Sequence, residues 1–389
     1  MKKTIYGLIL VTMVIFLTSC SQERHTTYHT YFDYSEQELK ELESLDSKNL
    51  MATQDLYKWD AKAFDLVATY TLKEDFSHST AKIYAYLAVA QRDAAYISFN
   101  EKGKFAGSLD PVSKEVLCLF FEDDCSDLEA DSDEYSNALA KIVVAKVKDR
   151  IKEDSEMLTP YTIKDGGEYW NGPQPSIGLS EGSSKTWVIE SGSQFRVPPP
   201  PSFDSEEFKE QVAITKAAVG NVTVDQKRKV VFWAGGPGTK TPPGQWLEIA
   251  DDYMKKENTD FEKAINVRAL LTMSICDANI AVLDSKYTHL VKRPFMMDSS
   301  ILTVMPTPNH PSYPAGHSTL SGAAGTVLIH FFPEAKSEWE ILAEEGGVSR
   351  VWGGIHYMMD HEQGKILGEK IAQEGLKQIE HADEHDDEH

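Results

Sequence analysis

The segment SRVWGGIHYMMD, residues 349–360, decides the fold assignment because it sets three chemically distinct side chains in a fixed order. Arg350 comes first, His356 follows six residues later, and Asp360 lies four residues beyond the histidine. Residues four apart on a helix are neighbours on one face, so the carboxylate can hold one ring nitrogen of His356. The other nitrogen is then free to act as a nucleophile or a ligand. Such a pair is more often structural when it stands alone, so its meaning depends on the rest of the chain.

A second segment, KYTHLVKRP at residues 286–294, supplies two more cationic side chains. Lys286 and Arg293 are seven residues apart, which places both on one helix face if the helix continues that far. Arginine offers a planar, bidentate fork and lysine a point charge, and both suit a group with several negative oxygens. Together with Arg350 they predict a cage for a tetrahedral oxyanion such as phosphate or vanadate. A lone arginine would more often be a surface ion-pair partner.

A third segment, HPSYPAGHST at residues 310–319, precedes a run of small residues that predicts a helix. Gly316 and His317 therefore fall at a helix N-terminus, where free N–H groups and the helix dipole favour an anion. The glycine allows the backbone to approach the anion closely. His317 is then placed to move a proton on the side opposite His356.

In combination, the three segments resemble the phosphatidic acid phosphatase type 2 and vanadium haloperoxidase superfamily. Its pattern is a lysine, six residues, then Arg-Pro; Pro-Ser-Gly-His; and Ser-Arg, five residues, His, three residues, Asp. The matching positions are Lys286, Arg293, Pro294, Pro314, Gly316, His317, Ser349, Arg350, His356 and Asp360. Further segments at residues 195–208, 232–246 and 276–287 look like the soluble bacterial haloperoxidase-like branch. The similarity covers residues 169–376 and is weaker before them.

This resemblance implies an all-α fold, a helical bundle of the acid phosphatase/vanadium haloperoxidase type, and it implies a role for each matched side chain. His356 would be the axial vanadate ligand or the phosphorylated nucleophile. His317 would be the acid/base, and Asp360 would orient His356. The oxyanion would be bound by Lys286, Arg293, Arg350 and the backbone N–H of Gly316. His310 matches a histidine that bromoperoxidase-type members carry near the halide region, and the alternative is a loop residue stiffened by the proline after it.

Two positions depart from the family pattern. Ala315 replaces a serine whose hydroxyl donates to the anion, and a hydrogen bond to a charged group contributes about 1.5–3 kcal/mol. Its loss weakens oxyanion binding about ten- to a hundredfold unless Ser312 or Ser318 compensates. Lys292 stands where the bacterial branch often has an aromatic residue, and it changes the pocket wall or adds positive charge at the rim.

Three functions are consistent with these residues. The first is a vanadium haloperoxidase-like enzyme, with vanadate as cofactor and peroxide and halide as substrates. The alternative is an acid phosphatase-type hydrolase of phosphomonoesters that works through a phosphohistidine and needs no cofactor. The same cage stabilises both transition states, so the motifs do not separate them. A non-catalytic surface lipoprotein on this scaffold is the second alternative, and the resemblance alone suggests a homodimer.

The N-terminus predicts export. Lys2 and Lys3 precede an apolar run that ends in Leu-Thr-Ser-Cys, and this arrangement resembles a bacterial lipoprotein signal peptide, residues 1–20. Cleavage before Cys20 and lipid on its thiol would anchor a soluble body to a membrane, facing the periplasm or the cell surface. An ordinary signal peptide with an incidental cysteine is the alternative. The net charge of −22 argues against nucleic acid as a partner.

The remaining cysteines are Cys118, Cys125 and Cys276. An oxidising compartment permits a Cys118–Cys125 disulfide across a short acidic segment, and two unpaired thiols are the equal alternative. Cys276 lies in an apolar helical run and is expected to be an inert core thiol.

The pattern of apolar residues divides the chain into helices and irregular connections. Helical spacing predicts helices at 81–100, 138–153, 206–219, 261–283, 318–332, 338–345 and 357–382, while short strands are predicted at 186–190 and 229–232. No segment after the signal peptide is expected to span a membrane. The stretch 234–246 is predicted to be irregular. The predicted divisions are a signal peptide at 1–20, a tether at 21–35, a helical part at 36–154, a Gly/Ser/Pro-rich loop at 155–204, a catalytic helical core at 205–380 and a solvated acidic, His-rich tail at 381–389.

Overall fold

The computed structural model describes residues 28–73 and 79–386, and throughout them the regular secondary structure is helical. No β-strand occurs in this part of the chain, and a single antiparallel bridge joins Leu50 to Ala106. The predicted all-α fold class is therefore confirmed. The α-helices are α1 Glu36–Glu43, α2 Thr53–Tyr70, α3 Thr80–Lys102, α4 Asp110–Cys118, α5 Glu134–Met157, α6 Glu206–Gly220, α7 Val224–Phe232, α8 Thr241–Lys256, α9 Phe261–His289, α10 Pro294–Met297, α11 Gly316–Phe331, α12 Lys336–Trp352 and α13 Met358–Asp386. Short 3₁₀ turns lie at Glu122–Asp127, Glu181–Ser183 and Pro333–Ala335.

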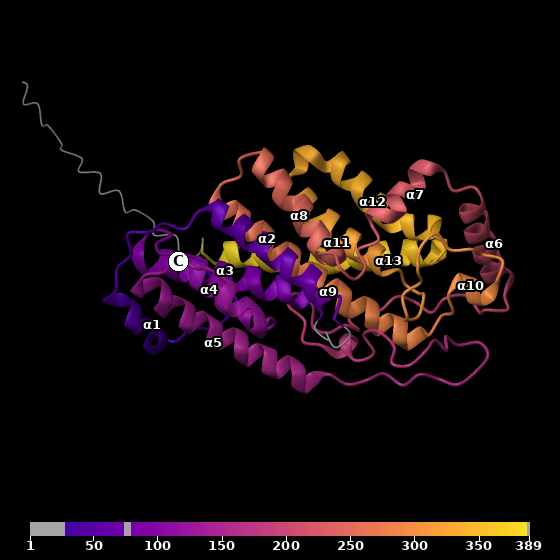
Figure 1. Ribbon diagram of the computed structural model, residues 1–389, viewed down its shortest axis with the longest axis horizontal. Coiled ribbons are helices and arrows are strands. Elements are labelled where there is room, and N and C mark those ends of the chain that lie inside the picture. The colour runs from indigo at the N-terminus through magenta and orange to yellow at the C-terminus, as the bar shows by residue number, and fades with distance from the viewer. Residues whose placement is uncertain (1–27, 74–78, 387–389) are drawn as a thin grey trace, which may run out of the picture.

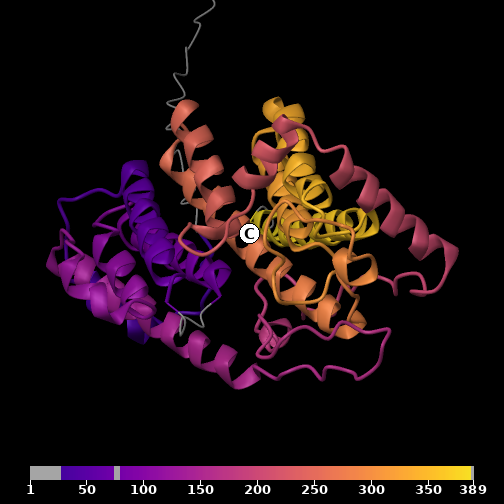
Figure 2. The ribbon, with the colours of Figure 1, turned by 45° about the vertical axis from the view of Figure 1, so that its right-hand side comes forward.

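Helix α9 is the central element of the bundle. The N-terminal helices α1 to α5 gather on one side of it and the C-terminal helices α11 to α13 on the other (Figures 1 and 2). It contacts α3, α8, α11 and α13, which is why apolar residues cover its whole circumference. Helix α11 contacts α9, α12 and α13 in turn, so the three motif segments converge at one end of this group.

The segment Phe261–Met297, which contains α9, is long and apolar enough to cross a membrane by length and composition. The expectation that no such segment follows the signal peptide was therefore wrong on that measure. Within the bundle, however, 89% of its apolar window is buried inside the protein. A helix surrounded by other helices needs apolar side chains all round, and this accounts for its composition.

Both predicted strands were wrong. Residues 186–190 form an irregular loop, whose N–H groups at Trp187, Val188 and Ile189 donate to the buried carboxylate of Asp277. Residues 229–232 are the end of α7, a helix that begins with a capping box between Thr223 and Gln226. Hydrogen bonds to a side chain distant in sequence in the first case, and a local capping box in the second, outweigh the strand preference of the β-branched residues nearby.

The stretch 234–246 is irregular only as far as Lys240, so that prediction was wrong for its last residues. Helix α8 begins at Thr241 with Pro242 and Pro243 in its first turn. Proline suits that position because its missing N–H would have had no intrahelical partner.

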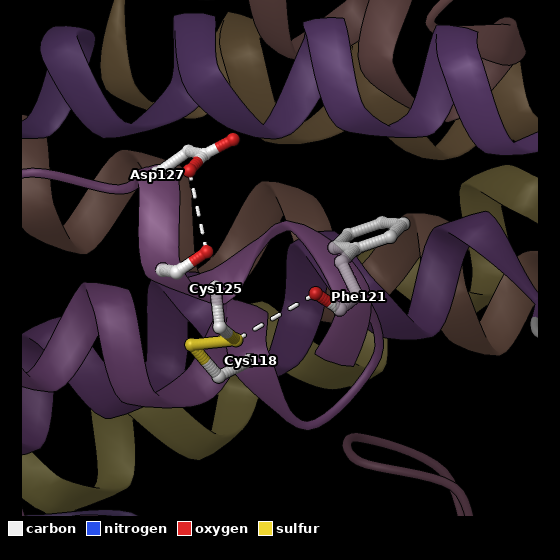
Figure 3. The surroundings of a disulfide bond; sticks show 5 residues. Cys118, Phe121, Cys125 and Asp127 are labelled. Atoms are coloured by element: carbon white, nitrogen blue, oxygen red, sulfur yellow. Dashed lines mark hydrogen bonds between the residues drawn. A yellow bond between two sulfur atoms is a disulfide. The ribbon is translucent and has the colours of Figure 1, made fainter.

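Figure 3 shows the disulfide bond between Cys118, at the end of α4, and Cys125, in the following 3₁₀ turn. The sulfur of Cys125 lies 3.6 Å from the carbonyl oxygen of Phe121. Cys276 is free and buried in α9, as an inert core thiol would be.

Several predictions fall outside the described residues. These are the signal peptide with Cys20, the first seven residues of the predicted tether, the side chains from residue 379 onward and the last three residues of the tail.

Candidate active site

Three cationic side chains are buried at the end of the bundle where the motif segments meet. Lys286 on α9, Arg293 just before α10 and Arg350 on α12 are each 1% exposed or less. None of them forms an ion pair within 4.0 Å with a carboxylate of the described residues. Their donors are met mostly by backbone carbonyls instead, as with Lys286 Nζ, which donates to the carbonyl oxygens of Pro311 at 2.9 Å and Ser312 at 2.6 Å.

Lys286 and Arg293 do not share a helix face, so that prediction was wrong. Helix α9 ends at His289 because Leu290 adopts a left-handed conformation with φ 53°, and its N–H closes the helix on the carbonyl of Lys286. The chain then turns, and Arg293 returns to the site as the residue before α10. The two cations are brought together by this turn and not by helical periodicity.

Arg293 lies between two histidines. Its Nη1 donates to His356 Nε2 at 3.0 Å and to the carbonyl oxygen of Ile355 at 2.7 Å. Its Nη2 donates to Nδ1 of the half-buried His310 at 3.1 Å. Burial lowers the pKa of Arg293 to about 10, so the guanidinium remains charged at neutral pH. It lowers the pKa of Lys286 well below its usual range, with the Arg293 charge as the second cause.

Arg350 has weaker partners than a buried guanidinium normally finds. It donates to the carbonyl oxygen of Val230 at 2.5 Å and to Ser349 Oγ at 3.1 Å, and its Nη1 lies 2.9 Å from the thioether sulfur of Met305. A thioether is a poor hydrogen-bond acceptor. Burial lowers the pKa of Arg350 to about 10, so a buried positive charge with spare donor capacity faces the site at neutral pH.

His356 and Asp360 form a buried pair. Nδ1 of His356 donates to Oδ2 of Asp360 at 2.8 Å, and the same oxygen accepts from Ser312 Oγ at 2.5 Å. Burial raises the pKa of Asp360 to about 6, so the carboxylate is still mostly ionised at neutral pH. Since Asp360 holds the proton on Nδ1, Nε2 of His356 is unprotonated and accepts the Arg293 hydrogen bond.

The N-terminus of α11 is tied to this pair, because the N–H of Ala315 donates to the carbonyl oxygen of Asp360 at 2.9 Å. The next three N–H groups, those of Gly316, His317 and Ser318, have no acceptor among the described residues. A Cβ atom placed on Gly316 would find nothing within 4 Å, so open space lies beside these donors. The helix start therefore offers free N–H groups to an anion.

His317 is held in one tautomer. Its Nε2 donates to the carbonyl oxygen of Trp233 at 2.7 Å, which leaves Nδ1 as an acceptor in the neutral ring. Burial, with the nearby Arg350 charge as the second cause, lowers the pKa of His317 to about 3. A negative ion in the site would oppose both effects and favour the protonated ring.

This low pKa makes a prediction for stability. The unfolded chain takes up a proton on His317 below about pH 6.5, whereas the folded site does not until about pH 3. Stability should therefore fall on acidification through this window, by up to about 1.4 kcal/mol per pH unit from His317. Glutamine at position 317 can still donate to the carbonyl oxygen of Trp233 but does not titrate. In urea unfolding, the free energy of unfolding of His317→Gln should therefore fall less steeply than that of wild type between pH 6.5 and 4.5. The same replacement at the exposed His330 is the control, and equal slopes in the two variants would contradict the placement of His317.

Residues 267–380 match the family model described as PAP2 superfamily, and the range contains every cation and histidine named above. These residues belong to the PAP2 superfamily. A curated relative is the bacitracin transport permease protein BcrC of Bacillus licheniformis, 35% identical over 57 residues, which are 15% of this chain. The match spans only 28% of that relative's length.

The fold likeness extends well beyond the PAP2 segment. The crystal structure of the first bacterial vanadium-dependent iodoperoxidase superposes with a TM-score of 0.68 at 20% identity, covering 86% of this chain and 98% of that one. The crystal structure of a holo-type bacterial vanadium-dependent chloroperoxidase superposes with a TM-score of 0.64 at 13% identity. The superposition covers 87% of this chain and 98% of that one. At such identities the likeness shows a shared fold.

Ala315 stands where the PAP2 pattern has a serine, and neither nearby serine replaces the missing hydroxyl. Ser312 donates to Asp360, and Ser318 is hydrogen-bonded to His361 at 3.0 Å. Lys292, the other departure, donates to the carbonyl oxygen of Gly167 and so holds the long loop on the body.

Ala315→Ser tests the missing hydroxyl. Ala315 is the N-cap of α11 in extended conformation, and an N-cap side chain points toward the free N–H groups of the first turn. A serine there should tighten phosphate binding about ten- to a hundredfold. Isothermal titration with phosphate measures this. An unchanged affinity, with a gain of about 1 kcal/mol in stability, would show instead that the hydroxyl only caps the helix.

The sequence did not indicate three groups at the site. The carbonyls of Trp233 and Val230 and the sulfur of Met305 contact His317 and Arg350, but no motif marks them. Only the general similarity of residues 232–246 pointed to the region of Trp233.

Proposed function

We propose that this chain is a PAP2 superfamily enzyme that binds vanadate at His356 and uses it to oxidise halide with peroxide. The observation that carries the proposal is the set of three buried cationic side chains without a carboxylate partner, arranged around a buried His–Asp pair. The fold shared with two vanadium-dependent haloperoxidases over most of the chain supports it.

The charge balance favours an oxyanion in this site. Burying a charge without a partner is costly. Asp360 is a nearby counter-charge for Lys286 and Arg293, whereas no carboxylate of the described residues forms an ion pair with Arg350. An oxyanion with several negative oxygens would accept charge-assisted hydrogen bonds from all three. It would also raise the depressed pKa of Lys286. The anion and the site are therefore expected to stabilise each other.

The donor set fits vanadate. Nε2 of His356 would be its protein ligand, and the three cations and the Gly316 N–H would hold its oxygens. Bound vanadate supplies a Lewis-acidic centre that activates peroxide toward a halide. Asp360 keeps the proton on Nδ1 of His356, so that Nε2 stays available. His317 accepts or returns a proton through Nδ1, while Trp233 fixes its orientation.

Phosphomonoester hydrolysis is the second candidate, and the unprotonated Nε2 of His356 favours it. In that reaction Nε2 forms a bond to phosphorus while the bond from phosphorus to the leaving oxygen breaks. A protonated His317 gives its proton to the leaving oxygen. Water then attacks the phosphohistidine, His317 takes a proton from that water, and phosphate leaves with His356 restored.

One experiment separates the two activities. The full chain is assayed with and without vanadate, for iodide and bromide oxidation by peroxide and for hydrolysis of a phosphomonoester. Vanadate-dependent halide oxidation supports the first function. Hydrolysis that vanadate inhibits supports the second and overturns the first. Neither activity, with no vanadate binding, overturns both.

We also propose that Cys20 carries lipid and anchors the protein to a membrane. The leucine, threonine and serine before it and the basic, apolar segment upstream support this proposal. Metabolic labelling with a fatty acid should mark the wild type, and Cys20→Ser should abolish the label. An equally labelled variant would contradict the assignment.

A further inference from the structure

A cavity of about 320 Å³ opens beside Arg293. Its lining residues include Trp170, Gly172, Phe295, Thr307 and Asn309. Arg293 is the only charged residue of the lining. Its Nη1 donates to His356, and its Nη2 approaches the carbonyl oxygen of Pro308 in the cavity wall at 3.4 Å. A single guanidinium group therefore separates the candidate nucleophile from this space.

The cavity walls are mostly apolar. Trp170 is 2% exposed and belongs to the hydrophobic cluster around Tyr287, while Phe295 is 42% exposed. A second hollow shares Phe295 and Thr307 with the first and extends to Leu302, which is 78% exposed. Exposed apolar side chains gathered next to a polar site commonly mark where an organic ligand binds.

The walls are held in place by hydrogen bonds. The side-chain amide of Asn309 donates to the carbonyl oxygens of Pro173 at 2.9 Å and Pro175 at 3.1 Å, so the long loop is fixed to the segment before α11. The N–H of Trp170 donates to the carbonyl oxygen of Leu290 at 2.6 Å. At Gly172 a Cβ atom would lie 2.2 Å from the Trp170 ring, so only glycine lets the indole lie against this backbone. Because these walls are already ordered, a ligand that enters the cavity loses little binding free energy to ordering them.

We infer that this cavity binds the uncharged aromatic group of an organic molecule whose reacting end lies in the oxyanion cage. The inference rests on the proposed oxyanion site. Arg293 contacts the negative end, while Trp170 and Phe295 line the space that the aromatic group would fill.

The test uses phosphonates, which carry the oxyanion on a stable P–C bond. Phosphate, methylphosphonate and phenylphosphonate are titrated into the full chain by calorimetry without any turnover. Wild type should bind phenylphosphonate about tenfold or more tightly than methylphosphonate. Phe295→Ala should reduce this ratio to threefold or less while the affinity for methylphosphonate stays the same. Phe203→Ala is the matched control, because Phe203 is 45% exposed in the long loop and does not line the cavity.

The outcomes separate the inference from the proposed function. If wild type binds phosphate and methylphosphonate but gains nothing from the phenyl group, the cavity assignment is wrong and the oxyanion site stands. The assignment is also wrong if Phe203→Ala reduces the preference for phenylphosphonate over methylphosphonate as much as Phe295→Ala does. If neither phosphate nor methylphosphonate binds, the proposed oxyanion site fails and the inference fails with it.

Discussion

Replacing His356 with alanine is expected to lower turnover by about a thousandfold or more, in whichever of the two activities the protein shows. Nε2 of His356 is the nitrogen that Asp360 leaves unprotonated, and it accepts a hydrogen bond from Arg293. Removing it deletes the group that holds or attacks the reacting oxyanion. The cations remain, so the affinity for phosphate should fall far less, by about tenfold.

Steady-state kinetics measure the fall in turnover, and calorimetric titration measures the fall in phosphate affinity. His330→Ala is the control, because His330 is exposed at the end of α11 and lies outside the motif segments. If His356→Ala keeps wild-type turnover, the histidine is only structural and the proposed chemistry is wrong. A parallel collapse of phosphate binding would show that His356 mainly supports the cage.

Arg350→Met should have two effects of opposite sign. It removes a charged donor from the oxyanion, so phosphate affinity should fall about a hundredfold or more. It also removes a buried charge whose partners are two carbonyl or hydroxyl oxygens and a thioether, so the ligand-free protein should be at least as stable as wild type. A loss of ligand affinity without a loss of stability is typical of a residue kept for function, and a residue kept for stability does not show it.

Arg268→Met is the matched comparison. Arg268 is as deeply buried as Arg350, but its guanidinium pairs with Asp60 and donates to Gln91 at 2.8 Å. Breaking a paired buried charge should cost about 3–5 kcal/mol of stability. Denaturant unfolding of both variants gives the comparison. Equal destabilisation by the two replacements would mean that Arg350 serves the fold, and would remove the main support for an oxyanion site.

The sequence predicted which residues lie near one another better than it predicted the path of the chain. The motif spacing named Lys286, Arg293, Arg350 and the His356–Asp360 pair. Arg293 contacts that pair, and the charges of Lys286 and Arg350 both act on His317. The route was different from the expected one, because Leu290 ends α9 before Arg293. A left-handed residue that is not glycine carries no strong sequence signal, so helical spacing appeared to continue where the helix had ended.

Hydrogen bonds to side chains explain the other errors. The capping box at Thr223 and the carboxylate of Asp277 decided two segments that composition alone assigned to strands. The long loop at 155–204 was expected to be irregular, and Asn309 and Lys292 hold it on the body. Contacts between residues so distant in sequence have no periodic pattern, and for this reason the cavity beside Arg293 could not be predicted.

Titration of orthovanadate into the full chain, in the presence and absence of phosphate, tests the central claim most directly. The account predicts one vanadate per chain, displaced by phosphate, with a dissociation constant about a hundredfold lower than that of Arg350→Met. Absence of vanadate binding to wild type, or equal affinity in Arg350→Met, would contradict the claim that these buried cations form an oxyanion site.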